Sequence, residues 1–107
     1  MNTQVDTGTN PKELPKYLSV TDAGVTITLS TPSMLNGVKL DKITMRSPTV
    51  REVRKCQQAH PNDELAVDTM LFASLAEIGT EDLMGLTLKD YQRVKTGYFR
   101  MVDEDEL

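Results

Sequence analysis

Two runs of alternating apolar and polar residues, joined by the dipeptide Asn36-Gly37, constrain the fold of this 107-residue chain more than any other feature. The first run, residues 25–29, alternates aliphatic residues with threonine, as in a strand that buries one face. Both central residues of a type I′ turn need a positive φ, which Asn and Gly tolerate, so the dipeptide predicts a β-hairpin over residues 24–46. The alternation of the returning run slips at Asp41-Lys42, which predicts a bulge there.

Capping signals downstream of the hairpin predict three main helices. Thr49 and Glu52 have the spacing of a capping box, in which each side chain accepts a backbone N–H of the other residue. Thr87 and Asp90 repeat this spacing near the C-terminal end. The expected helices cover residues 49–59, 62–78 and 88–102, with a single helical turn at residues 81–84. The expected fold class is therefore α+β, with an N-terminal β-hairpin followed by three main α-helices.

The middle helix is the most apolar of the three. Asn62 is expected to cap its start, and Gly79 is expected to end it. Its apolar residues fall on one broad arc, which predicts a face packed against other elements. The members of this arc are Leu65, Leu71, Phe72, Leu75 and Ile78.

Apolar residues and charges divide the chain into three parts. Residues 1–22 contain only six apolar residues, too few to offset the entropy of ordering them, which predicts a flexible N-terminal arm. Residues 23–102 are expected to form a single α+β domain. Residues 103–107 form an acidic C-terminal tail that accounts for the whole net charge of −4, because positive and negative charges balance in the rest of the chain. A balanced body lacks the surplus of Lys and Arg that a basic nucleic-acid binder needs.

Several other classes of protein and site are not supported by the sequence. The N-terminal residues lack the basic and apolar regions of a signal peptide, and no apolar stretch is long enough to span a bilayer. Cys56 and His60, even with Asp63 or Glu64, provide fewer ligands than a structural zinc site requires. The same cysteine and histidine lack the third group that would orient a nucleophile pair. We therefore expect no metal, no cofactor and no enzymatic activity.

A helix-turn-helix arrangement is an alternative for residues 49–59 and 62–78, because two adjacent helices are expected there. The first helix carries Arg51 and Arg54, but the second, which would read bases in the major groove, is acidic and apolar. A small DNA-binding regulator of a mobile element is therefore an alternative function.

Several sequence blocks occur in an informative order. The run Val25-Thr26-Ile27-Thr28-Leu29 and the turn Asn36-Gly37 precede the segment Ile43-Thr44-Met45-Arg46-Ser47-Pro48-Thr49 and a short helix. Later blocks are Leu71-Phe72-Ala73-Ser74-Leu75-Ala76 and Leu88-Lys89-Asp90-Tyr91. This order resembles the phage tail assembly chaperone family of long-tailed phages and prophages, especially Mu-like ones, in which a hairpin ending in Leu-Arg-x-Pro-Thr precedes a helical half. The resemblance covers residues 25–102, although Met45 stands where leucine is common and the N-terminal arm is longer.

The resemblance implies a non-enzymatic assembly factor. Family members bind the long helical tape measure protein in the host cytoplasm, keep it soluble until tail-tube subunits polymerise around it, and are absent from the finished virion. Many are made in two lengths by ribosomal frameshifting, so the resemblance implies that this chain is the short form. The implied partners are the tape measure protein, the tail tube protein and further copies of the chain, without nucleic acid or membrane. A minor structural tail protein is a further alternative.

Six residues are candidates for partner contacts. A small body with six methionines can present an adaptable apolar surface to a client helix. For the client, the pattern selects Leu71 and Leu75 on the middle helix, and Tyr98 and Phe99 near the end of the last helix. For contacts between copies it selects Arg51 and Arg54. The charged residues within 39–55 are mostly basic, whereas those within 63–90 are mostly acidic, so the two segments of different copies can attract each other.

Overall fold

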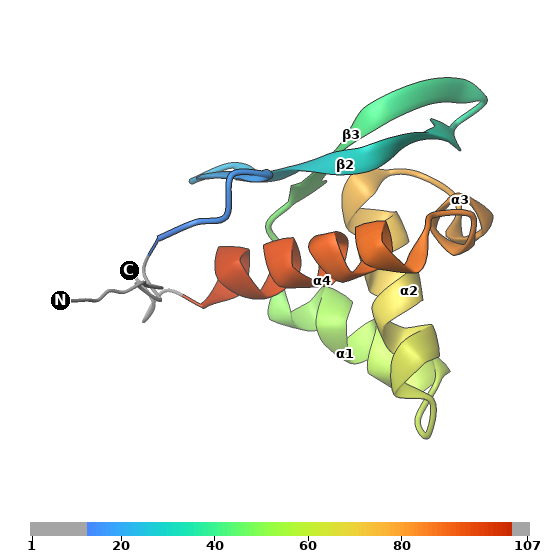
Figure 1. The fold of residues 1–107 in the computed structure, drawn as a ribbon. Helices are drawn as coiled ribbons and strands as arrows, with labels where there is room; N and C mark the ends of the chain where they lie inside the picture. Colours follow the sequence, from blue (N-terminus) through green and yellow to red (C-terminus); the bar gives the residue numbers. More distant parts are fainter. Residues whose placement is uncertain (1–12, 104–107) are drawn as a thin grey trace, which may run out of the picture.

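The computed structural model describes residues 13–103, which form two layers: a three-stranded antiparallel sheet and, on one face of it, four helices (Figure 1). The strands are β1 (Leu18–Thr21), β2 (Gly24–Leu35) and β3 (Val38–Arg46). The helices are α1 (Val50–Ala59), α2 (Glu64–Ala76), α3 (Thr80–Met84) and α4 (Leu88–Val102). The expected α+β class is confirmed.

β1 is a strand that the sequence analysis missed. It pairs with β2, so the expected hairpin is part of a sheet with the strand order β1-β2-β3. The prediction of a flexible arm over residues 1–22 is therefore wrong for β1, whose Leu18 side chain is buried in the core. Four residues give too short an alternation to identify a strand from sequence. Residues 1–12 of the expected arm and residues 104–107 of the expected acidic tail lie outside the described residues.

The turn between β2 and β3 has the backbone geometry that the sequence predicts. Asn36 and Gly37 have φ angles of 52° and 79°. The helical layer holds this turn, because Asp82 Oδ2 accepts the backbone N–H of Asn36 at 3.0 Å and Asn36 Nδ2 donates to the carbonyl of Glu77 at 3.1 Å. The tip of the hairpin is therefore anchored both to α3 and to the connection between α2 and α3.

The register of β2 and β3 shifts next to Asp41-Lys42, where a bulge is expected, but the extra residues lie on β2 and not on the returning strand. The ladder is regular as far as the pair Thr28–Lys42 and resumes at the pair Ser33–Leu40. Four residues of β2 therefore face a single residue of β3. The surplus residues lie on β2, and their backbone groups need partners outside the ladder.

Asp90 of α4 provides those partners. Its Oδ1 accepts the backbone N–H of Ser30 at 2.8 Å and its Oδ2 accepts that of Thr31 at 3.2 Å. Thr87 Oγ1 accepts the backbone N–H of Asp90, as the capping-box spacing predicts. The Asp90 carboxylate, however, binds β2 instead of the backbone of Thr87, so only half of that predicted box is formed.

The ends of α2 differ from those expected. Asp63, and not Asn62, is the N-cap, and its Oδ1 accepts the backbone N–H of Ala66 at 3.1 Å. The helix ends at Glu77, which adopts a left-handed conformation with φ 58°, two residues before Gly79. Gly79 instead caps the start of α3, which occupies the place of the expected single turn.

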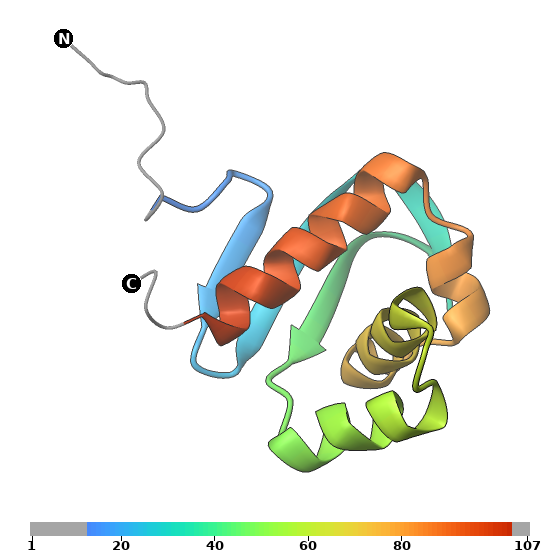
Figure 2. The same ribbon diagram turned by 90° about the horizontal axis from the view of Figure 1, so that it is seen from below.

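The core lies between the sheet and the helices. α4 crosses β1 and β2, whereas α2 packs against β3 (Figure 2). Ile27, Phe72 and Val94 are fully buried and join the two layers. α4 approaches the sheet closely at Gly97, because a Cβ atom there would lie 2.9 Å from Cγ1 of Ile27. The absence of a side chain at this position therefore sets the spacing of the layers.

Candidate functional site

Three adjoining hollows lie at the corner of the molecule where α1 begins and α4 ends. The first, of about 390 Å³, lies between the start of α1 and residues Tyr98 and Val102 of α4. The second, of about 480 Å³, shares Pro48 and Val102 with the first and extends to β1. The third, of about 700 Å³, shares Val50 and Arg54 with the first and follows α1. The shared residues make the three hollows one continuous surface.

We refer to this region as the α1–α4 surface. It consists of Pro48, Val50, Arg51, Arg54, Lys55, Tyr98, Phe99 and Val102. Three of its apolar side chains are strongly exposed: Val50 by 76%, Phe99 by 53% and Val102 by 43%. Apolar side chains exposed together commonly mark a site for another protein.

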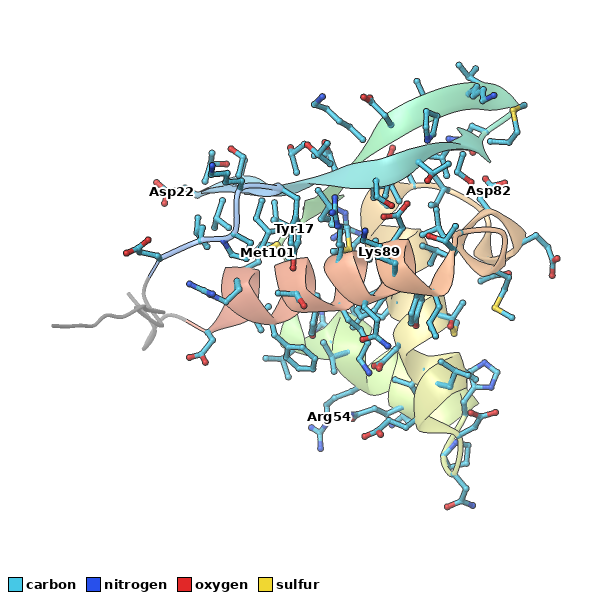
Figure 3. All side chains as sticks on the ribbon, in the orientation of Figure 1. Tyr17, Asp22, Arg54, Asp82, Lys89 and Met101 are labelled. Atoms are coloured by element: carbon cyan, nitrogen blue, oxygen red, sulfur yellow. The ribbon has the colours of Figure 1, made fainter. Side chains whose placement is uncertain are left out.

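The exposed charges on α1 are positive. Arg51, Arg54 and Lys55 are exposed, and none of them forms an ion pair with a carboxylate within residues 13–103. Figure 3 shows Arg54 projecting from α1 away from the rest of the fold. The site therefore combines apolar contact area with positive charge that no carboxylate of residues 13–103 pairs with, and such charge suits an acidic partner.

A bidentate ion pair fastens the start of α1 to the end of β3. Arg46 donates from Nη1 to Glu52 Oε1 at 2.9 Å and from Nη2 to Oε2. Glu52 also completes the predicted capping box, because its Oε1 accepts the backbone N–H of Thr49 at 3.0 Å and Thr49 Oγ1 accepts the backbone N–H of Glu52. The hydrogen bond from Arg46 is the main reason that the pKa of Glu52 is lowered to about 2. Since Glu52 is the only acid on α1 and is already paired, the helix presents a net positive face.

Tyr98 connects the surface to the core. Its ring centre lies 5.1 Å from that of the buried Phe72 and 5.4 Å from that of Phe99, which meets it edge-on. Burial raises the pKa of the Tyr98 phenol. Because Phe72 holds the Tyr98 ring in place, the base of the first hollow is already formed before another protein binds.

Two of the six predicted contact residues are not on this surface. Leu71 and Leu75 are each 2% exposed and belong to the core, so no partner can reach them in this conformation. The apolar arc of α2 faces α1, α3 and β3 instead of solvent. Leu65, expected on the same arc, is 59% exposed. The prediction of a packed face is therefore confirmed for Leu71, Phe72 and Leu75 and wrong for Leu65. The sequence does not show whether the fold itself or a partner covers such a face.

The structure brings the other four predicted residues together. Arg51 and Arg54 from α1 and Tyr98 from α4 line adjoining hollows, although 28 residues separate the end of α1 from the start of α4. Phe99 joins them through its ring contact with Tyr98. The six residues selected from the sequence do not include the exposed Val50 and Val102. Val50 is the first residue of α1 and Val102 is the last residue of α4. An apolar residue at the end of a helix is the only signal that the sequence offers for them, because helical periodicity does not predict burial of a terminal residue.

The candidate thiol and the possible metal ligands can be judged within residues 13–103. Cys56 is buried, and burial raises the pKa of its thiol, which disfavours a reactive thiolate. Within residues 13–103, no three His, Cys, Asp or Glu side chains are grouped so that they could share a metal ion. Nor does any helix in this part of the chain have the length and apolar character needed to cross a membrane.

Comparison with known families gives a match that covers most of the chain. A family model described as "Phage tail assembly chaperone proteins, E, or 41 or 14" matches residues 26–103, from β2 to the end of α4. No curated protein and no solved structure gives a significant match. The matched segment contains every residue of the α1–α4 surface.

Proposed function

Because the chain belongs to the phage tail assembly chaperone family, we propose that it binds the tape measure protein of its phage and keeps that protein soluble during tail assembly. It acts without catalysis in the host cytoplasm and leaves before the virion is complete. The family match supports a role in tail assembly, and the exposed apolar and basic side chains of the α1–α4 surface support this region as the site for the client. The tail tube protein is a further candidate partner.

The chemistry of the α1–α4 surface suits a long amphipathic helix. Val50 and Val102 provide apolar contact on either side of the hollow whose floor is Tyr98. A helix that binds a groove in this way inserts side chains spaced three or four residues apart. Arg51 and Arg54, at the rim, would select clients that carry carboxylates beside those apolar positions. Repetition of such a pattern along a client would allow several chaperone copies to bind one molecule.

The Val50→Asp substitution tests this site. We expect it to reduce the amount of tape measure protein recovered in the soluble fraction on co-expression by about tenfold, because it places a charge in the apolar contact. The measurement is the ratio of soluble to total tape measure protein. Leu88→Asp is the matched control: Val50 and Leu88 are each the first residue of a helix, and they are 76% and 73% exposed. An acidic residue is tolerated at both positions by the helix dipole.

Several measurable outcomes would contradict the proposed client site or the chaperone role. If Leu88→Asp and Val50→Asp reduce client solubility equally, the client does not bind at the α1–α4 surface. If the tape measure protein is soluble alone, or stays insoluble with the wild-type chain, the chaperone role is wrong. Detection of the chain in purified virions would favour a structural tail protein. Binding to duplex DNA that weakens steeply with salt would favour the regulator.

A further inference from the structure

The outer edge of β3 carries apolar side chains that the fold leaves uncovered. β3 is the last strand of the sheet, and no described segment pairs with its free side. Val38 and Leu40 are 55% and 44% exposed, although they lie on the same face as the buried Leu35, opposite Val38 in the ladder. An open edge with exposed apolar residues is a template for pairing with another strand.

The backbone of this segment is oriented for such pairing. Leu35 and Val38 close a two-residue turn, and the residues of such a closing pair exchange both backbone hydrogen bonds. Because the direction alternates along a strand, the N–H and C=O groups of Lys39 and Asp41 point away from β2. Leu40 between them bonds toward β2, opposite Ser33. The free edge therefore offers two residues, two positions apart, for hydrogen bonds to a new strand.

The charges around Leu40 are self-complementary. We propose that β3 pairs antiparallel with β3 of a second copy, with the two Leu40 residues opposite each other on a twofold axis. In this register Lys39 of each copy faces Asp41 of the other, so the contact contains two identical cross-strand pairs of opposite charge. Each such pair also exchanges the backbone hydrogen bonds that the free edge offers. Val38 and Leu40 of both copies then lie on one face of the joined sheet and form one apolar strip.

Two observations favour this occupant over an unrelated strand. Charged residues on an edge normally prevent pairing, but a positive and a negative residue placed symmetrically about one leucine permit pairing with the same sequence. The existing contact of the Asp41 carboxylate is weak, since Lys42 Nζ lies 3.9 Å away and both side chains are more than half exposed. Asp41 therefore gives up little when it pairs with a second copy. This interface involves none of the residues of the α1–α4 surface and does not depend on the proposed client.

Charge reversal tests the register directly by sedimentation equilibrium of the whole chain. Lys39→Asp places two pairs of like charge across the axis, and we expect it to weaken the dimer about tenfold; Asp41→Lys should do the same. The double variant Lys39→Asp/Asp41→Lys restores opposite charges in both pairs and should dimerise as the wild type does. Mixing the two single variants should give a mixed dimer, because one then carries two acids and the other two bases.

The mixed dimer and the rescue distinguish this contact from other interfaces. If the wild type is a monomer throughout the accessible concentration range, the proposal is wrong. If it dimerises but the single variants are unaffected, or the double variant fails to recover, the interface lies elsewhere. Lys42→Glu, which changes a neighbouring exposed charge outside the central pairs, should weaken the dimer less than Lys39→Asp. Circular dichroism of each variant establishes that the fold is retained.

Discussion

The Asp90→Ala variant is expected to lose about 3 kcal/mol of its free energy of unfolding, because a buried carboxylate that accepts two backbone hydrogen bonds disappears. Asp90 is 1% exposed, and its two oxygens hold the N–H groups of Ser30 and Thr31 in the bulge of β2. Ser30 and Thr31 lie in the part of β2 that has no paired residues on β3, so the sheet ladder provides no acceptor for their N–H groups. Urea denaturation followed by circular dichroism measures the loss.

Asp82→Ala provides the matched control for that variant. Asp82 also accepts two backbone N–H groups, those of Asn36 and Gly79, but it is partly exposed and water can replace it. We expect a loss of about 1 kcal/mol there. Equal losses in the two variants would show that the burial of Asp90 adds nothing, and would contradict its role as the anchor of the bulge.

The effect of Asp90 should depend on pH. Burial alone would raise the pKa of Asp90, but hydrogen bonds from Ser30 and Thr31 and the nearby Arg93 outweigh burial, and the net pKa is lowered. A carboxyl with a lowered pKa stabilises the fold above its ordinary pKa of about 3.9, and that contribution disappears as the pH falls through its folded value. The deficit of Asp90→Asn relative to wild type should therefore be full at pH 7 and shrink below about pH 4. Glu52, whose pKa is also lowered, is present in both proteins and cancels in the difference.

The interactions that were predicted from sequence are local ones. The turn at Asn36-Gly37 and the capping box of Thr49 and Glu52 each involve residues no more than three positions apart, so their geometry follows from the neighbouring residues alone. The role of Asp90 was predicted only in part for the same reason. Its spacing from Thr87 gives the cap, but the partners of its carboxylate lie about 60 positions away in β2.

The candidate site was predicted in the same partial way. The helical pattern identifies Leu71 and Leu75 as members of an apolar face, but an apolar face looks the same in sequence whether the fold or a client covers it. Tyr98 was selected with them and does line the α1–α4 surface, because it lies near the end of α4, where the covering elements stop. The proximity of this tyrosine to Arg54 depends on how α1 and α4 pack, which no local pattern encodes.

The Gly97→Val variant is expected to lose about 3 kcal/mol of its free energy of unfolding, because its side chain has no room between α4 and the sheet. A Cβ atom at this position would lie 2.9 Å from Cγ1 of Ile27 and 3.2 Å from Cδ2 of Leu18. Both neighbours are buried, and Ile27 is wholly enclosed, so neither can move aside without disturbing the core. Thermal or urea denaturation measures the loss.

Gly85→Ala is the control, and it separates crowding from any general effect of replacing glycine. A Cβ atom at Gly85 would come no closer than 3.6 Å to another atom, and its backbone is already right-handed, so we expect little change in stability. Alanine in place of a glycine inside a helix ordinarily stabilises it by about 1 kcal/mol, so Gly97→Ala should fail to show that gain. If Gly97→Ala instead raises stability by that amount, α4 stands farther from β2 than the structure shows. The short β1 strand would then lose the support of α4, because Leu18 packs against the same glycine.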